Sequence, residues 1–193
     1  MSVKGLFNDY RDYLTMLDDE DIRDFVGAVD WFLNQRNLEA VRVPGVRHMQ
    51  GLDQYSSGHE LRLVNSLLAE LDTVQWMRIY SEDEVGSEFH ENWGYLELLG
   101  GRGHFDSSQR AGGFYLQGPN QNYKSHKHVA EELFIPLTEG SLWMRDNGEF
   151  VEHPVGEVIV HESNEVHSMR TNDKPLLALW MWRDGDLMQK PEF

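Results

Sequence analysis

The stretch NYKSHKHVAEELF, residues 122–134, constrains the fold and the chemistry of this chain more than any other. It places two histidines one residue apart, and a pair of glutamates follows within four residues. If residues 125–137 form one strand, alternate side chains share a face, and this face carries His126, His128, Glu132 and Phe134. Two imidazoles and a carboxylate are costly to bury unless a partner compensates them, and a divalent metal is such a partner. The stretch therefore predicts part of a metal site on the inner face of a strand.

A further ligand is expected from GEVIVHESNEVHSM, residues 156–169. Gly156 is a plausible turn residue before an apolar strand that ends at His161. A polar bend at residues 162–165 follows, and His167 would open the next strand. Spacing leaves both histidines as candidates. Neutral imidazoles with one carboxylate suit zinc, iron, manganese or nickel and leave positions free for a substrate.

The second half of the chain has the pattern of short β-strands. Clusters of glycine and asparagine separate apolar runs that we expect to be strands: FYLQG (114–118), ELFIPL (132–137), SLWMR (141–145), EVIVH (157–161) and LLALWMW (176–182). Several short strands at this spacing predict an antiparallel sandwich or barrel, which includes the cupin type of jelly roll.

The first half has helical periodicity. Residues 6–36 carry apolar side chains at helical spacing, with Asp19 or Asp21 as the expected N-terminal cap of this segment. Residues 58–80 also carry apolar side chains at helical spacing. The periodic positions are Phe25, Val29, Phe32 and Leu33 in the first segment and Leu61, Val64, Leu67, Leu68 and Leu71 in the second. The predicted fold class is α+β, with a helical region over residues 1–90 and a single β-barrel or sandwich over residues 91–193, which the resemblance described below identifies as a cupin barrel.

Composition excludes several classes of protein. The chain has no cysteine, which removes disulfides, thiolate ligands and cysteine nucleophiles. Its formal net charge of −16 argues against binding to nucleic acid. No apolar run reaches the roughly 20 residues needed to span a bilayer, and the N-terminus lacks the pattern of a signal peptide. We therefore expect a cytoplasmic protein that binds neither nucleic acid nor membranes.

The histidine spacing carries a family resemblance. His126-x-His128-x3-Glu132, with Gly156 and His167 downstream, resembles the two cupin motifs, although Glu162 occupies the usual proline position of the second. The runs YKSHKHVAEELFIPLTEGSLWM, GEVIVHESNEVHSM and PLLALWMWRDGDL are similar, more narrowly, to the cupin-type dimethylsulfoniopropionate (DMSP) lyases. The resemblance is strong over about residues 112–187 and weak before them. It implies a helical region ahead of one cupin barrel, and a homodimer is a further expectation because cupins often pair.

The resemblance also implies a ligand set and a reaction. Its metal ligands fall on His126, His128, Glu132 and His167. The implied substrate is a small cationic carboxylate, cleaved by β-elimination to acrylate and dimethyl sulfide. One family tyrosine is present as Tyr123, which becomes the candidate catalytic base.

Phe134 stands where the family has a second tyrosine, which keeps a different cupin chemistry open, such as a metal-dependent isomerase or dioxygenase. A non-catalytic binding cupin is a third possibility, which a complete ligand set disfavours.

A sulfonium group requires an apolar, aromatic surround, where cation–π contacts contribute roughly 0.5–2 kcal/mol per ring. Aromatic residues on the predicted strands supply candidates for such a pocket: Tyr115, Phe134, Trp143, Trp180 and Trp182.

Overall fold

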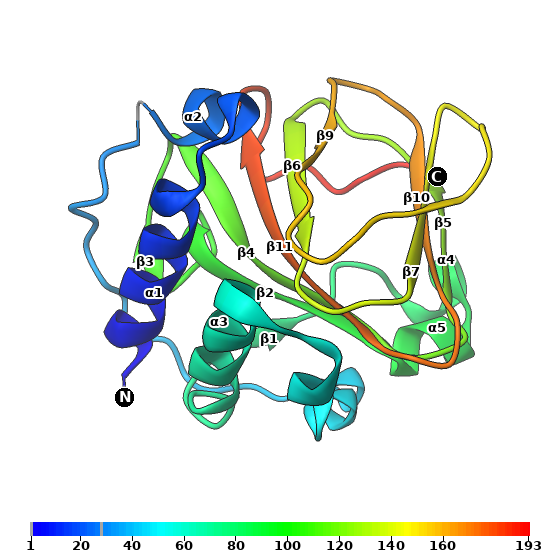
Figure 1. Cartoon of the computed structure of the whole chain (residues 1–193), viewed down its shortest axis with the longest axis horizontal. Helices are drawn as coiled ribbons and strands as arrows, with labels where there is room; N and C mark the ends of the chain where they lie inside the picture. The colour runs from blue at the N-terminus through cyan, green and yellow to red at the C-terminus, as the bar shows by residue number, and fades with distance from the viewer. Residues whose placement is uncertain (1, 28) are drawn as a thin grey trace.

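The computed structural model describes residues 2–27 and 29–193. Two β-sheets face each other, and a group of helices covers the outer face of the larger sheet (Figure 1). Among the described residues, the larger sheet has seven strands in the order β1-β2-β4-β11-β6-β9, with β3 beside β2, and the smaller has the order β5-β10-β7-β8. All pairings are antiparallel except that of β2 with β3. The predicted α+β class with one cupin jelly roll is confirmed.

The helices lie mostly before residue 92 and the strands after it. The helical segments are α1 (Val3–Met16), α2 (Glu20–Val26), the 3-10 helices η1 (Pro44–Met49) and η2 (Leu52–Tyr55), α3 (Gly58–Leu68), α4 (Glu82–Val85) and α5 (Ser87–Glu91). The strands are β1 (Trp76–Met77), β2 (Trp93–Gly100), β3 (Phe105–Asp106), β4 (Arg110–Gln117), β5 (Asn122–His126), β6 (Glu131–Pro136), β7 (Ser141–Arg145), β8 (Val151–Glu152), β9 (Ile159–His161), β10 (His167–Thr171) and β11 (Leu176–Arg183). Each of the five runs expected to be strands overlaps one of these strands: β4, β6, β7, β9 and β11.

Strand alternation gives the larger sheet two different faces. Along β11, Leu177, Leu179 and Met181 pack into the core beneath α1 and α3, whereas Ala178, Trp180 and Trp182 pack toward the smaller sheet. Successive side chains of a strand point to opposite faces, so one segment serves both cores. The face toward the smaller sheet is rich in aromatic residues and holds the candidate site.

The single helix predicted for residues 6–36 is wrong. The chain forms α1 and α2, and residues 29–43 are irregular apart from isolated bridges at Gln35 and Val41. Asp19 interrupts the helix, because its side chain accepts a hydrogen bond from the Ile22 backbone amide (3.1 Å) and caps α2, as one of the two expected cap residues. Phe32, placed on the predicted apolar face, is 97% exposed.

The second predicted helix, residues 58–80, is too long. It ends at Leu68, and the following turn is held by the Thr73 hydroxyl, which donates to the backbone carbonyl (2.9 Å) and to the carboxylate (2.7 Å) of Glu70. The chain then joins the larger sheet as β1, which pairs with β2. The division at residue 90 stays a prediction.

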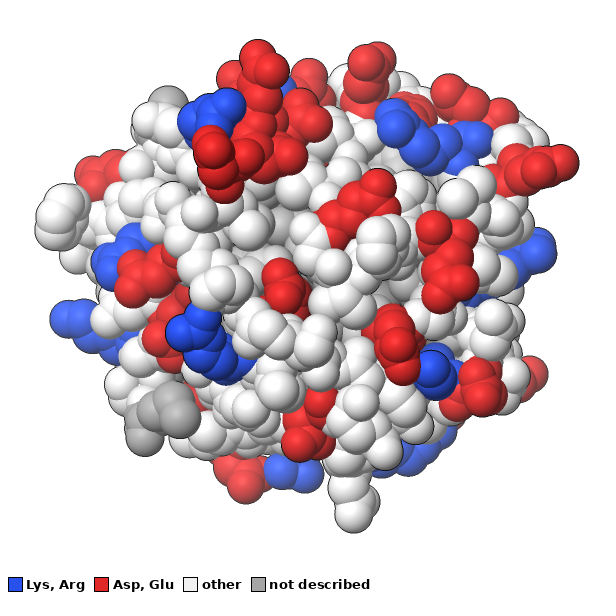
Figure 2. Space-filling view, in the orientation of Figure 1, with Lys and Arg blue, Asp and Glu red and all other residues white. Residues whose placement is uncertain are grey.

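The surface is acidic. Asp and Glu side chains are distributed over the face shown in Figure 2, with Lys and Arg in smaller groups between them. Within residues 2–27 and 29–193, no helix combines the length and the apolar character that a membrane span requires.

Candidate metal centre and adjoining cavity

Three histidines and a glutamate converge between the two sheets. His126 ends β5 and His167 begins β10, and the two are direct partners across the smaller sheet. Glu132 belongs to β6 in the larger sheet, and His128 lies in the connection between β5 and β6. The prediction of one continuous strand over residues 125–137 is therefore wrong. The side chains meet because the chain crosses from one sheet to the other at residues 127–130.

The ligand atoms of this group are close together. One ring nitrogen from each of His126, His128 and His167 lies within 4.8 Å of the others, and all three residues are buried. The Oε2 atom of Glu132 is 2.9 Å from Nε2 of His128 and 3.3 Å from Nε2 of His167. We call these four residues the histidine–glutamate cluster.

Backbone carbonyls fix the orientation of the three imidazoles. Nδ1 of His126, His128 and His167 lies 2.9, 2.8 and 2.9 Å from the carbonyl oxygens of Lys124, Ala130 and Glu165. A carbonyl only accepts, so each Nδ1 carries the proton, and in a neutral ring the Nε2 atom presents a lone pair.

The resulting donor set fits a metal ion. Nε2 of His167 has no hydrogen-bond partner among the described residues. A lone pair on Nε2 of His128 at 2.9 Å from a carboxylate oxygen is repulsive unless a proton or a cation lies between them. Nitrogen ligands with one carboxylate suit a divalent transition metal.

The electrostatics favour the protonation state that a metal requires at Glu132 and His126, whereas at His128 the neighbouring Glu132 carboxylate favours a proton in the place of a metal. Burial would raise the pKa of the Glu132 carboxyl, but His128 and His167 outweigh it and the net shift is downward. Burial and the neighbouring His167 lower the pKa of His126 well below its ordinary value. Burial lowers the pKa of His128, whereas Glu132 raises it, and the net shift is upward. An ionised Glu132 and a neutral His126 are the ligand forms.

His161, the competing candidate, lies beside the cluster rather than in it. Its ring stacks on His167 with centroids 4.1 Å apart, and its Nδ1 atom is 3.1 Å from Oε1 of Glu165. Burial, followed by the proximity of His167, lowers the pKa of His161 to about 4. His161 therefore supports the position of the His167 ring.

Glu165 connects His161 to Arg145 at the protein surface. Replacing Glu165 tests whether this pair of contacts stabilises the part of the fold that carries His161 and His167. The Glu165 carboxylate pairs with Arg145 and accepts from the Glu162 backbone amide (3.0 Å). Burial would raise the pKa of Glu165, but these donors and His161 hold it down at about 2. A carboxyl with a depressed pKa stabilises the fold above its unfolded-state pKa of about 4.3, and this stability is lost as the pH falls toward 2.

We expect Glu165→Gln to lower the free energy of unfolding at pH 7 by about 1 kcal/mol, because its charge-assisted hydrogen bonds to Arg145 and His161 are exposed or only partly buried. Urea denaturation from pH 7 to pH 2 measures the difference from the wild type, which should shrink below pH 4. Glu139→Gln, which removes an exposed partner of Lys174, is the matched control and should have a much smaller effect. An equal effect of both variants would contradict the role of Glu165.

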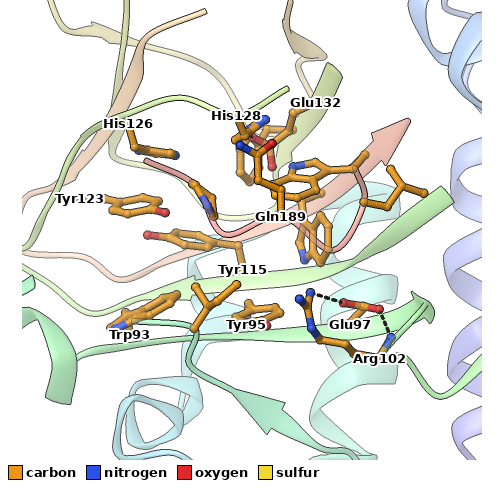
Figure 3. Close-up of a pocket in the computed structure, with 16 residues that line it drawn as sticks. Trp93, Tyr95, Glu97, Arg102, Tyr115, Tyr123, His126, His128, Glu132 and Gln189 are labelled. Atoms are coloured by element: carbon orange, nitrogen blue, oxygen red, sulfur yellow. Dashed lines mark hydrogen bonds and ion pairs between the residues drawn. The ribbon is translucent and has the colours of Figure 1, made fainter. Parts of the chain in front are cut away.

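A cavity adjoins the histidine–glutamate cluster (Figure 3). Its empty volume is about 550 Å³, including the part open to solvent. Its walls contain the candidate base Tyr123 and four of the five residues expected at a substrate pocket: Tyr115, Phe134, Trp180 and Trp182. Trp143 is an exception, because it packs behind Phe134 at 5.1 Å between ring centroids and donates its indole N–H to Ser141 Oγ (2.9 Å).

Tyr123 lies between the cluster and an aromatic layer. Its ring stacks on His126 with centroids 3.9 Å apart, and its hydroxyl is 2.8 Å from the hydroxyl of Tyr80. Burial raises the pKa of the Tyr123 phenol well above its ordinary value, so ionisation requires a nearby cation.

Several cavity residues were not expected from the sequence. Trp93, Tyr95, Glu97 and Arg102 come from β2 and the loop after it, and Ile79 precedes α4. Glu97 is the one with a signal in the sequence, because it is a charged residue inside the apolar run of β2. Its partner Arg102 lies across the cavity from the cluster, as Figure 3 shows.

The C-terminal segment, residues 186–193, forms another wall. Leu187, Gln189 and Pro191 line the cavity. The backbone of Glu192 exchanges two hydrogen bonds of 2.9 Å with the backbone of Lys127, and the ring of Phe193 lies 4.7 Å from that of Tyr80. The segment therefore closes the cavity next to His128.

Removal of Pro191–Phe193 tests this wall. We expect the Michaelis constant for the substrate to rise by up to about 30-fold, because two backbone hydrogen bonds of about 1 kcal/mol each would no longer hold the segment. Steady-state kinetics measure it, with Phe32→Ser as a control that alters an exposed aromatic side chain elsewhere. An unchanged Michaelis constant would show that the segment does not shape the cavity.

Comparisons with known proteins agree with one another. The dimethylsulfoniopropionate lyase family model matches residues 28–178. The chain is 25% identical to dimethylsulfoniopropionate lyase DddQ of Ruegeria pomeroyi over 82% of this chain and 79% of the relative.

Two crystal structures also match nearly the whole chain. One comes from work on the DMSP lyases RdDddP and RnDddQII, with a TM-score of 0.90, 27% identity and coverage of 98% of this chain and 96% of that chain. The crystal structure of DddQ from Ruegeria pomeroyi DSS-3 superposes with a TM-score of 0.83 at 23% identity, covering 96% and 95% of the two chains, and supports the fold.

Proposed function

This chain belongs to the dimethylsulfoniopropionate lyase family, and we propose that it cleaves DMSP to acrylate and dimethyl sulfide at the histidine–glutamate cluster. The observation that carries the proposal is the position of the cluster at one end of a cavity lined largely by aromatic residues. One end of such a cavity suits a carboxylate and the other a compact cation, which are the two ends of DMSP.

The residues proposed to hold a divalent metal are His126, His128, Glu132 and His167. A metal in this position would act as a Lewis acid on the substrate carboxylate and thereby acidify the adjacent C–H bond. The orientation of the three imidazoles by backbone carbonyls supports this assignment, since such bonds direct the free lone pairs of metal-binding histidines. Zinc, iron, manganese and nickel all suit the ligand set.

Tyr123 is the proposed base. Its oxygen would accept the proton from the carbon next to the carboxylate. The electron pair then forms the carbon–carbon double bond, and the carbon–sulfur bond breaks with its pair on sulfur. The products are acrylate, neutral dimethyl sulfide and one proton per turnover. The Tyr80 hydroxyl, 2.8 Å away, supports this role because it can donate a hydrogen bond to the Tyr123 phenolate.

The remaining cavity residues are proposed to bind and enclose the substrate. Tyr115 and Trp180 present π-faces that suit a sulfonium. Trp182 lies 4.4 Å from the His128 ring, and its indole N–H has no acceptor among the described residues, so it is available to a bound carboxylate. Phe134 has no proton to exchange and contributes an apolar wall, packed edge-on against Tyr115 at 6.0 Å.

Product stoichiometry tests the proposed reaction. Purified protein loaded separately with each candidate metal is incubated with DMSP and followed by proton NMR. The proposal predicts one acrylate for each DMSP consumed, without oxygen uptake. Consumption of DMSP that yields another product, or no consumption with a bound metal, would overturn it.

A further inference from the structure

Glu97 is a buried carboxylate that the proposed reaction does not use. It lines the cavity, yet the residue is only 2% exposed. Apart from Glu132, the other residues lining this cavity are aromatic, apolar, neutral polar or basic. An anionic group in such a wall is costly unless a cation compensates it.

Strand register places Glu97 at the far side of the cavity from the cluster. Glu97 pairs with Gly113 of β4, Gly113 with Trp180 of β11, and Trp180 with Phe134 of β6. Partners in one row point to the same face of a sheet, and strands lie about 4.8 Å apart. Glu97 is therefore about 14 Å from Phe134 between Cα atoms. Phe134 stands two residues from Glu132, so the row leads from the cluster past Trp180 to Glu97.

The protein compensates Glu97 only in part. Oε1 accepts a hydrogen bond from the backbone amide of Arg102 (2.6 Å). The Arg102 guanidinium stays 3.9 Å from Oε2, beyond hydrogen-bond distance, and donates instead to the Met188 carbonyl (2.6 Å). Figure 3 shows the two contacts between Glu97 and Arg102, which lie at the end of the cavity opposite His126 and Glu132.

Aromatic rings occupy the space between the two ends. Tyr95 and Trp180 meet edge to face, with centroids 6.2 Å apart, and both line the cavity. A cation held against these rings would have the Glu97 carboxylate at the end of the same row. Burial raises the pKa of Glu97. Arg102, the Gly103 backbone amide and the Arg36 charge oppose this shift without overcoming it. A bound cation would favour the ionised form further.

We infer that Glu97 is a specificity-determining residue, which selects substrates with a positive charge at the end remote from the carboxylate. The inference rests on the proposed function, since it takes the substrate carboxylate to lie at the cluster. It assigns the sulfonium end to the Glu97 side of the cavity, with Tyr95 and Trp180 beside it. Arg102 is a positioning residue that holds the Glu97 carboxylate by its backbone amide.

Two unreactive carboxylates test the inference by binding alone. N,N-Dimethyl-β-alanine carries a positive charge where 4-methylpentanoate carries a neutral branched carbon, and both match DMSP in chain length. Isothermal titration calorimetry of the metal-loaded protein gives both dissociation constants. We expect the wild type to bind the cationic compound at least tenfold more tightly. A wild type without this preference would overturn the inference, whatever the variants do.

Glu97→Gln keeps the hydrogen bond from the Arg102 amide and removes only the charge. We expect the ratio of the two dissociation constants, 4-methylpentanoate over N,N-dimethyl-β-alanine, to fall about tenfold, while 4-methylpentanoate binds as before. Glu139→Gln, which removes a surface carboxylate outside the cavity, should leave this ratio unchanged. A ratio in Glu97→Gln equal to that of the wild type would overturn the inference.

The lyase assay separates this outcome from a failure of the proposed function. Dimethyl sulfide release by the wild type together with an unchanged ratio in Glu97→Gln would leave the lyase intact and remove only the role of Glu97. Absence of dimethyl sulfide together with a ratio that collapses in Glu97→Gln would keep Glu97 as the cation-selecting residue and remove the lyase.

Discussion

His128→Ala is expected to reduce dimethyl sulfide release from DMSP by at least 100-fold. Even partners that only orient metal ligands change affinity or activity by about 10–100-fold, and His128 is proposed to be a ligand itself. The change also removes the group 2.9 Å from Glu132 and leaves that buried carboxylate without its nearest partner. Metal analysis of the purified variant should show a large loss of bound ion.

His153→Ala is the matched control. His153 is half-buried, pairs with Glu157 and does not line the cavity. Metal content and activity should match those of the wild type. Full activity and full metal content in His128→Ala would remove this residue from the proposed ligand set.

Tyr123→Phe is expected to lower kcat by about 10²–10⁴-fold, the range over which a positioned acid or base contributes. The ring that stacks on His126 remains, so metal content and the binding of unreactive carboxylates should change little. This combination distinguishes a lost proton acceptor from a disturbed site. Steady-state kinetics and metal analysis on the same preparation measure both.

Tyr55→Phe provides the control for the loss of a phenolic hydroxyl. Tyr55 ends η2 and lies under the Lys174 side chain, outside the cavity. Its kinetics should equal those of the wild type. If Tyr123→Phe retains full kcat, the base must be another group.

Composition and pattern were sufficient to predict the class of fold and to group His126, His128 and Glu132. Only the family resemblance selected His167 over His161. The alternation of His126, His128 and Glu132 suggested a common face, and these side chains do meet. They meet for another reason, because β5 and β6 belong to different sheets and the chain crosses between them at His128. Periodicity reports which residues are buried together, but it does not report a change of sheet.

The errors in the first half have a similar origin. Apolar spacing continued through Asp19 and past Leu68, whereas the Asp19 side chain caps the start of a separate helix, α2, and a turn held by Thr73 follows the end of α3. Phe32 satisfied the helical pattern and is exposed, since the segment that carries it is irregular.

The far end of the cavity was not predictable for a geometric reason. Glu97 appears as a single charge in an apolar strand, and a β-bulge between Glu97 and Leu99 shifts the register beside it. The residues that complete this wall, such as Leu187 and Pro191, are distant in the sequence. Trp143 was expected in the substrate pocket because it is an aromatic residue on a predicted strand, but it packs behind Phe134 and does not line the cavity.

Headspace measurement of dimethyl sulfide tests the central claim most directly. Wild-type protein is assayed with DMSP as purified, after removal of metal by a chelator, and after zinc, iron, manganese or nickel is restored singly. The proposed chemistry predicts release that disappears with the metal, returns with at least one of the four ions, and stays absent in His128→Ala under every condition. Release that is unaffected by the chelator and by His128→Ala would contradict a metal-dependent lyase at the histidine–glutamate cluster.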